Sequence, residues 1–184
     1  EKAPKLGGVS AYSAGEVWLA NNPKMREQGI EDSDEAGRRY LEFLSGGCAE
    51  PELRDALLAH GREAIDYFAR HAGVRWHCLP RIPDYYFPRV ESAHRGGRLL
   101  AVDLFHGREL GPWQDRVLHS PHMPQGLTHA DLERFGGLAN VAGWDYELLA
   151  QRIRDDWRGT GPALAAAFVK AALVDRGIAA FLAC

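Results

Sequence analysis

The stretch PALAAAFVKAALVDRGIAAFL, residues 162–182, decides the fold class. Pro162 suits the first turn of a helix, and the alanine-rich run that follows predicts a helix to Arg176. Gly177 supplies a C-cap, and residues 178–182 are typical of the start of a β-strand. Because a helix, a glycine and a strand make up half of a βαβ unit, the sequence predicts an α/β protein.

Upstream of this stretch, the sequence predicts further helices. Asp32 as N-cap with Glu35 three residues later forms a capping box, and Gly46 ends the helix that it opens. The next helix is expected from about Pro51 to His71. The apolar positions expected to face inward on the two helices are Ala36, Tyr40, Phe43, Leu44, Leu53, Leu57, Ile65 and Phe68.

Shorter elements are expected in the rest of the chain. Residues 74–77 and 99–105 predict strands, and residues 107–113 predict a turn. Thr128 with Asp131 caps a short helix, and a longer helix is expected over residues 144–157. The glycines and proline of residues 159–162 should separate that helix from the alanine-rich one.

Composition restricts the class of protein and its partners. The 184 residues are 46% hydrophobic and 26% charged, which suits one globular domain or a large piece of one. The net charge of −3 gives no bias toward polyanions, so no nucleic-acid partner is expected. No apolar run approaches the roughly 20 residues of a membrane span, so no stable span is expected either.

The cysteines and the chain ends give two further expectations. Cys48, Cys78 and Cys184 are far apart, odd in number and without a CxxC pair, which favours a reducing, cytoplasmic location. The chain begins at Glu1 without Met and stops inside an expected strand, so we expect both ends to be cut from a longer chain.

The segment LGGVSAYSAG, residues 6–15, has no helical period. It predicts a loop whose own backbone comes close to another group. Gly8, Ser10, Ser13 and Gly15 would present N–H groups and hydroxyls to a pyrophosphate, although an ordinary surface loop has the same composition. Glu1 would suit a ribose-binding acid at the end of a strand, or a solvated acid. No G-x-G-x-x-G fingerprint accompanies it.

Residues 79–97 predict a long irregular loop that is rich in aromatic side chains. Three prolines and the pair Gly96-Gly97 exclude regular structure. A phenol of Tyr85 or Tyr86 could donate a hydrogen bond to a carbonyl oxygen or act as a base, and packing of the loop onto the core is the alternative.

The histidine motif His119-x-x-His122, with His129 beyond it, is not expected to bind a metal. Pro121 prevents the first two from sharing a helix face, and no HExxH motif or cysteine accompanies them. The acidic pair Asp155-Asp156 fits a helix surface rather than a paired-carboxylate hydrolase.

Several segments resemble one known family. The start of the chain, EKAPKLGGVSAYSAGEVWLANNPKMREQGIEDSDEAGRRYL (residues 1–41), resembles the flavoprotein family of fumarate reductases and 3-ketosteroid dehydrogenases. NNPKMREQGIEDS (21–33), PDYYF (83–87) and GGRLLAVDLFHGRELGPW (96–113) are similar to its ketosteroid dehydrogenase branch. GTGPALAAAFVKAALVDRGI (159–178) resembles a helix that leads into a later strand of the same domain.

This resemblance implies a fold and a cofactor. The fold would be a partial, helix-rich FAD/NAD(P)-binding Rossmann-like domain that lacks its first βαβ unit, with residues 1–184 forming its central part. Residues 1–15 would be the FAD loop, 79–97 the active-site loop and 162–184 the helix and strand that return to the FAD sheet. The cofactor would be FAD, with no metal.

The resemblance also assigns residues to the cofactor. Glu1, in an acid-Lys pair with Lys2, would bind the adenosine ribose hydroxyls. The pyrophosphate would lie along Gly8, Val9 and Ser10. The ribityl chain and the isoalloxazine would lie along Tyr12, Ser13, Ala14 and Gly15.

The implied activity is FAD-dependent oxidation of a CH–CH bond in a small, hydrophobic, 3-ketosteroid-like substrate, by hydride transfer to the flavin. In such enzymes one tyrosine hydrogen-bonds a second that abstracts the proton, and Tyr86 or Tyr85 matches the supporting position. The alternatives are a fumarate-reductase-like dicarboxylate oxidoreductase and a non-catalytic flavoprotein fragment. The sequence does not indicate an oligomeric state.

Overall fold

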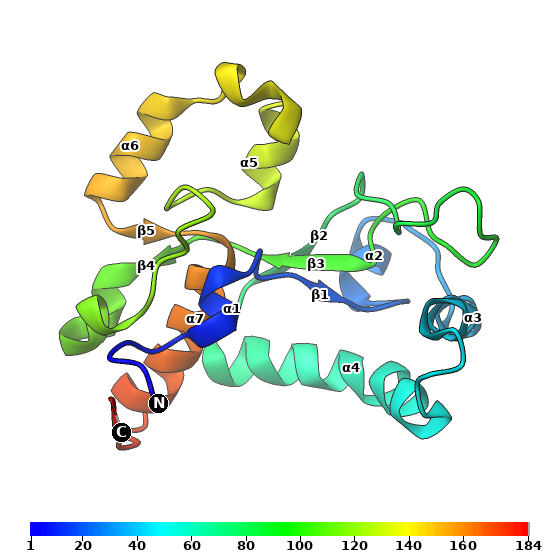
Figure 1. Cartoon of the computed structure of the whole chain (residues 1–184), viewed down its shortest axis with the longest axis horizontal. Helices are drawn as coiled ribbons and strands as arrows, with labels where there is room; N and C mark the ends of the chain where they lie inside the picture. Colours follow the sequence, from blue (N-terminus) through cyan, green and yellow to red (C-terminus); the bar gives the residue numbers. More distant parts are fainter. Residues whose placement is uncertain (184) are drawn as a thin grey trace. The chain divides into compact units, whose positions relative to one another are not determined.

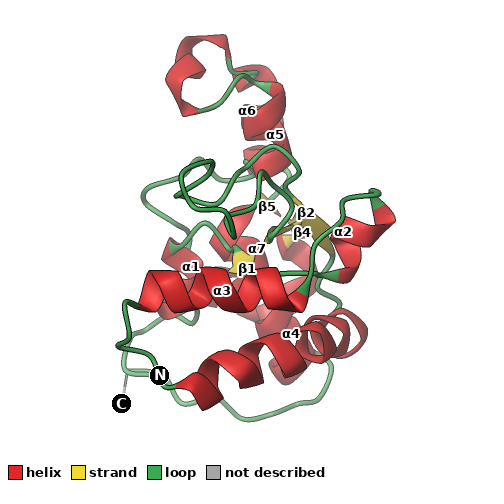
Figure 2. Ribbon diagram, turned by 90° about the vertical axis from the view of Figure 1, so that its right-hand side faces the viewer, coloured by secondary structure: helices red, strands yellow, loops and turns green. Residues whose placement is uncertain are grey.

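The computed structural model describes residues 1–183, in which helices predominate over short strands (Figures 1 and 2). The chain packs into two compact units. The first unit takes in Glu1–Glu16, Ala69–Arg75 and the described part of Ala101–Cys184, and the second takes in Val17–Phe68 and Trp76–Leu100. Each unit therefore combines segments that are far apart in the sequence.

The second unit contains a small sheet and its helices. Strand β3 lies between β1 and β2, and it pairs antiparallel with β1 through Val17 opposite Leu100. The core includes Leu19, Met25 and Leu58, each at most 2% exposed. The elements that lie wholly or mainly in this unit are β1 (Val17–Trp18), α2 (Pro23–Glu27), α3 (Asp34–Ser45), α4 (Pro51–Ala72), β2 (Trp76–Cys78) and β3 (Leu99–Val102).

The ends of α3 confirm one expectation and correct another. Gly46 ends the helix in the left-handed conformation, as predicted. The N-cap is Ser33 rather than Asp32, because the Ser33 hydroxyl accepts the Ala36 N–H at 3.1 Å. The Asp32 carboxylate binds Arg98 instead.

The buried faces of α3 and α4 are narrower than the sequence predicted. Tyr40 is buried in α3, but Phe43 and Leu44 are largely exposed. In α4, Ile65 is buried as expected, whereas Leu53 and Leu57 face solvent and Leu58 takes the inward position. The predicted apolar stripe of α4 is therefore displaced by one residue at Leu57, because the adjacent Leu58 offers a second apolar position for the inward face.

The first unit is built around two clusters of apolar side chains. Ala11, Leu110, Val117, Ala165 and Ala166 form the first cluster, and Leu127, Leu132, Phe135, Trp144 and Leu149 form the second. The elements are α1 (Gly8–Tyr12), β4 (Phe105–His106), the 3-10 helices η1 (Gly107–Arg116) and η2 (Leu138–Gly143), α5 (His129–Arg134), α6 (Tyr146–Arg154), β5 (Trp157–Arg158), α7 (Thr160–Val169) and the π-helical turn η3 (Lys170–Val174).

The second cluster joins α5 to α6, which lie next to each other in Figures 1 and 2. Thr128 and Asp131 form the predicted capping box at the start of α5. The helix expected over residues 144–157 is shorter. It ends at Arg154, and Trp157 belongs to β5, which pairs antiparallel with β4. The strand expected over 99–105 is likewise divided into β3 and β4, and the turn expected over 107–113 belongs to η1.

The last third of the chain needs two corrections. The alanine-rich helix begins at Thr160, two residues before the expected start, so Pro162 lies in the first turn of α7 as predicted, and Thr160 has a left-handed conformation. The strand expected over 178–182 is absent from the described residues. Glu1 N–H donates to the Phe181 carbonyl and Ala183 N–H to the Ala3 carbonyl, which is too few bonds for a ladder. Cys184, expected to continue it, lies outside the described residues.

The lengths and composition of the helices also bear on membranes. Within residues 1–183, none of the helices combines the length and the apolar character that crossing a bilayer requires.

Candidate functional site

The segment expected to carry the cofactor, residues 6–15, is partly helical rather than a loop, because Gly8–Tyr12 form α1. Ala11 is fully buried in the cluster that includes Ala165 and Ala166 of α7, whereas the Val9 side chain is 82% exposed. Sequence reasoning missed this helix because five residues are fewer than two turns, too few to show a period. The segment therefore has one buried and one open face.

Two glycines seat this segment against the start of α7. A Cβ on Gly15 would lie 2.6 Å from the carbonyl carbon of Thr160 and 2.8 Å from the Gly161 nitrogen. A Cβ on Gly161 would clash with the carbonyl oxygens of Ser10 and Ser13, and its N–H donates to the Ser13 carbonyl at 3.1 Å. The two backbones are therefore in direct contact, which only glycine permits at both positions.

The first turn of α1 presents backbone N–H groups beside open space. The N–H groups of Gly8, Val9 and Ser10 lie in the first turn, where a helix offers them no backbone acceptor. No side chain among residues 1–183 caps this end of α1, and no other atom lies within 4 Å of the position of a Cβ on Gly8. Free N–H donors beside open space are suited to a pyrophosphate.

Glu1 and Lys2 are exposed at the edge of the same unit. The α-amino group of Glu1 donates to the Phe181 carbonyl at 2.8 Å, so the first residues run beside the last described ones. One oxygen of the Glu1 carboxylate accepts the Ala3 N–H at 3.1 Å. A carboxylate accepts several donors, so this group can still bind a pair of hydroxyls.

The loop of residues 79–97 contains no helix or strand, as expected. Its two tyrosines differ in their surroundings within the second unit. The Tyr85 side chain is 97% exposed, whereas Tyr86 is 46% exposed and its ring contacts Phe43 edge-on at 5.0 Å between centroids. Tyr86 is therefore held by a neighbouring ring, and Tyr85 projects into solvent.

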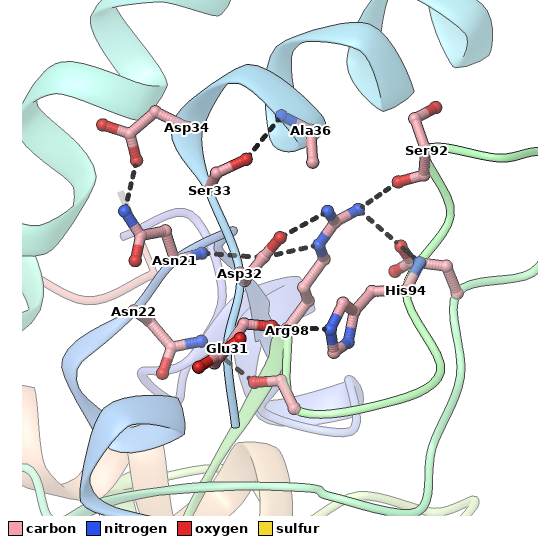
Figure 3. Close-up of polar contacts among 12 residues, drawn as sticks. Asn21, Asn22, Glu31, Asp32, Ser33, Asp34, Ala36, Ser92, His94 and Arg98 are labelled. Carbon is pink, nitrogen blue, oxygen red and sulfur yellow. Dashed lines mark hydrogen bonds and ion pairs between the residues drawn. The ribbon is translucent and has the colours of Figure 1, made fainter. Parts of the chain in front are cut away.

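A buried guanidinium holds this loop in place (Figure 3). Arg98 donates from Nε and Nη2 to the Asp32 carboxylate, both at 2.8 Å. Its Nη1 donates to Asp84 at 2.8 Å and to the Ser92 carbonyl at 2.9 Å. The three charged side chains are each at most 2% exposed. One guanidinium thus pairs with two buried carboxylates, so carboxylates outnumber cations in this cluster.

Additional donors compensate this excess negative charge. The Trp18 indole N–H donates to one Asp84 oxygen at 2.8 Å, and the His94 backbone N–H donates to the other at 2.7 Å. Burial by itself raises the pKa of Asp32, but hydrogen bonds from Arg98 and a backbone amide outweigh it and hold this pKa below its ordinary value. Asp32 is therefore an ionised partner of Arg98.

Tyr40 is a third tyrosine associated with this loop, and it is buried. The Arg98 guanidinium lies 5.6 Å from its ring centroid. Burial and the nearby charge of Asp84 raise the pKa of Tyr40, so it stays a neutral phenol.

Sequence reasoning identified the two exposed tyrosines but missed the residues that position them. The available signals were Asp84, which precedes the tyrosine pair, and Arg98, which follows two glycines at the start of a strand. Neither signal shows that the two side chains meet, because an ion pair between distant positions has no sequence period.

The histidine motif does not assemble a metal site. Among residues 1–183, no three His, Cys, Asp or Glu side chains converge as metal ligands. Burial and the charge of Arg158 lower the pKa of His119, while His122 and His129 contact the cofactor segment. The expected cofactor residues all lie in the first unit, and Tyr85 and Tyr86 lie in the second.

Several known proteins are similar to this chain in sequence. A 3-oxosteroid 1-dehydrogenase of Mycobacterium tuberculosis is 38% identical over 111 residues, which are 60% of this chain and 20% of the relative. A 4-oxocyclohexanecarboxylate 2-dehydrogenase of Sinomonas cyclohexanicum is 33% identical over 174 residues, 94% of this chain and 29% of the relative. The chain therefore spans about a fifth to a third of these relatives.

A solved structure has the same fold. The 3-ketosteroid delta1-dehydrogenase of Sterolibacterium denitrificans, in complex with 1,4-androstadiene-3,17-dione, superposes on the whole chain with a TM-score of 0.84 and 27% identity, over 35% of that protein. The model of one family, described as an FAD binding domain, matches residues 1–182. With its helix-rich α/β fold and an open helix end suited to a dinucleotide, the chain belongs to the family of FAD-binding domains.

Proposed function

We propose that this protein is an FAD-dependent oxidoreductase that introduces a double bond next to a ring ketone, with a hydrophobic 3-ketosteroid as the first candidate substrate. The names of the relatives carry this proposal. One is a 3-oxosteroid 1-dehydrogenase and another a 4-oxocyclohexanecarboxylate 2-dehydrogenase. In both names, the dehydrogenated position lies two carbons from the oxo carbon, so the shared reaction is desaturation beside a cyclic ketone.

The cofactor would lie along the first unit. Glu1, in its pair with Lys2, would accept the adenosine ribose hydroxyls, and the N–H groups of Gly8, Val9 and Ser10 would bind the pyrophosphate. Residues 12–15 would follow the ribityl chain and the isoalloxazine. The uncapped end of α1 and the open space at Gly8 support this placement. When bound, FAD would supply the hydride acceptor.

This arrangement also gives a proposal for the domain. Residues 1–184 would be the central part of a Rossmann-like FAD domain whose first βαβ unit is not among them, with 1–15 as the FAD segment and 162–184 as the return to the FAD sheet. The two backbone hydrogen bonds between residues 1–3 and 181–183 support this, since they link residue 1 with 181 and residue 3 with 183, and the two segments therefore run parallel. A cytoplasmic location stays a prediction from the cysteines.

The loop of residues 79–97 would contribute to the chemistry through a phenol. A tyrosine that donates a hydrogen bond to a second, proton-abstracting tyrosine stabilises the phenolate of that partner and lowers its pKa. Tyr86 is favoured over Tyr85 for this role because it is held against Phe43, and a fixed donor loses less entropy on binding. Asp84, directly before the pair, fixes the loop backbone through Arg98.

A smaller cyclic ketone acid is the second candidate substrate. The Sinomonas relative matches 94% of this chain, whereas the Mycobacterium relative matches 60%. The dicarboxylate alternative is not proposed, because the names of these relatives denote oxidation beside a ring ketone. A non-catalytic flavoprotein is the outcome that the following experiment would expose.

The test is anaerobic reduction of the bound flavin. The intact protein, purified with its cofactor, is mixed with a saturated 3-ketosteroid or with 4-oxocyclohexanecarboxylate, and bleaching of the visible flavin absorbance is followed. We expect bleaching by the steroid at low concentration. Bleaching by the cyclohexane acid alone would favour the second candidate. Protein that binds FAD but is reduced by neither compound would contradict the proposed activity, and protein without flavin would contradict the cofactor assignment as well.

A further inference from the structure

Residues 119–129, called here the histidine segment, contact the FAD segment at two places in the first unit. At the first, the Ser120 hydroxyl donates to the Tyr12 carbonyl at 3.3 Å, and the ring of His122 lies edge-on to the Tyr12 ring at 6.4 Å between centroids. The histidine motif, which was not expected to bind a metal, therefore contacts a residue expected to line the flavin.

His129 makes the second contact, on both sides of Gly15. Its Nε2 lies 3.2 Å from the carbonyl oxygen of Ala14, and its Nδ1 lies 3.2 Å from a carboxylate oxygen of Glu16. The His129 side chain is well buried, and that of Glu16 is about a quarter exposed. One imidazole thus ties together the residues before and after the glycine that rests on Thr160.

The two groups that His129 contacts, the Ala14 carbonyl and the Glu16 carboxylate, require the imidazole to be the donor. A backbone carbonyl and a carboxylate both accept hydrogen bonds and donate none. A doubly protonated imidazole donates to both, and a neutral one donates to only one of them. His129 is the first residue of α5 and lies within the Thr128–Asp131 capping box, which fixes its backbone. A capped helix end therefore holds the residues on either side of Gly15.

We infer that His129 is a positioning residue for the flavin, acting through Ala14 and Glu16 on the backbone that would follow the isoalloxazine. This rests on the proposed path of FAD along residues 12–15. The turn at Gly15 is thus contacted both by His129 and by the Thr160–Gly161 backbone. Removal of the imidazole releases one side and lets the flavin ring system shift relative to its substrate.

The test compares His129→Phe with His60→Phe in the intact protein. Phenylalanine keeps an aromatic ring but has no donor, and His60 is an exposed histidine of α4, in the other unit, which serves as the matched control. Apoprotein is titrated with FAD, and the visible circular dichroism of the bound flavin is recorded. We expect His129→Phe to raise the dissociation constant of FAD about tenfold and to change the flavin dichroism, while His60→Phe changes neither.

Two further variants keep the inference falsifiable if phenylalanine disturbs folding. His129→Gln retains one donor and should give an intermediate dissociation constant, and Glu16→Gln, which weakens one of the two bonds, should resemble it. Wild-type affinity and dichroism in folded His129→Phe, or in both milder variants, would overturn the inference while the proposed function stands. Wild-type protein that binds no FAD would overturn both.

Discussion

Gly15 and Gly161 are needed at the candidate site because glycine has no Cβ. At both positions, two backbones meet where a Cβ would overlap carbonyl groups of the opposite segment. The motif around residues 6–15 predicted a close approach at Gly15 and assigned it to FAD, whereas the structure shows a close approach by the backbone of Thr160 and Gly161. The role of Gly161 could not be predicted, because its constraint comes from Ser10 and Ser13, which only the folded chain brings to it.

Gly161→Ala should therefore reduce FAD binding without unfolding the protein. Alanine favours the helix by about 1 kcal/mol over glycine, but overpacking against fixed carbonyls costs about 1–3 kcal/mol and displaces the FAD segment. Flavin occupancy and thermal unfolding are measured together. Gly61→Ala is the control, since its Cβ would press on the Leu19 side chain in the other unit rather than on the FAD segment. Full flavin occupancy in Gly161→Ala would show that the segment tolerates displacement.

Tyr86→Phe should lower the rate of substrate oxidation by about 10²-fold while FAD occupancy stays unchanged, because a donor that supports a catalytic base acts on the rate. Tyr85→Phe should behave like wild type, since Tyr85 projects into solvent in the second unit. The measurement is steady-state kcat with an artificial electron acceptor at equal flavin content. A larger effect at Tyr85 would reverse the assignment, and no effect at either tyrosine would leave the loop a packing element.

Helix ends that are set by local chemistry were predicted well, whereas ends that depend on distant partners were not. Gly46 and the Thr128–Asp131 box were identified because each cap is complete within a few residues. Asp32 was assigned as a cap because its side chain suits that role, but the buried Arg98 competes for it and Ser33 caps α3 instead. A local pattern cannot show which of two adjacent capping residues a distant arginine will bind.

Arg98→Met should destabilise the second unit by about 3–5 kcal/mol, because it leaves Asp32 and Asp84 buried without their cation. The free energy of unfolding is measured in urea. Arg39→Met is the matched control, since Arg39 is more than half exposed and should change stability by less than about 1 kcal/mol. If both variants lose the same stability, the buried cluster does not hold the loop.

Acid should weaken both units through carboxylates with lowered pKa values. Burial tends to raise the pKa of Asp32 and of Asp131, but hydrogen bonds from Arg98 and from Arg152, respectively, outweigh it, so both pKa values lie below the ordinary one. The unfolded chain therefore binds these protons at higher pH than the folded one. Their contribution is complete above about pH 4 and is lost as pH falls through the folded values.

The measurement is the free energy of unfolding in urea between about pH 6 and about pH 3. Wild type should lose stability steeply in the lower part of this range. Asp32→Asn, which has nothing to protonate at that position, should start less stable but show a shallower slope. A slope equal to that of wild type would show that Asp32 does not titrate with folding.

At the scale of the whole molecule, the sequence predicted the α/β class and the irregular aromatic loop, but not the division into two units. Each unit recruits distant segments, and two of the boundaries fall within α4 and β3, where the sequence shows no break in pattern. Composition and periodicity report on local structure, while this division arises from tertiary packing. The strand expected over residues 178–182 is absent for a similar reason, because a strand forms only where a neighbouring strand supplies backbone hydrogen bonds.

Several large apolar side chains near the two ends of the chain are exposed. Phe181 is 74% exposed, and Ile178 and Val9 are also largely exposed, so a polypeptide of these 184 residues carries large apolar side chains in water. Such exposure promotes association, and we expect this polypeptide to self-associate in size-exclusion chromatography with light scattering. Ile178→Thr combined with Phe181→Ser should shift it toward monomer, whereas Leu53→Ser, at an exposed site of α4 in the other unit, should have less effect. A monodisperse monomer before any substitution would show that these side chains are satisfied as they stand.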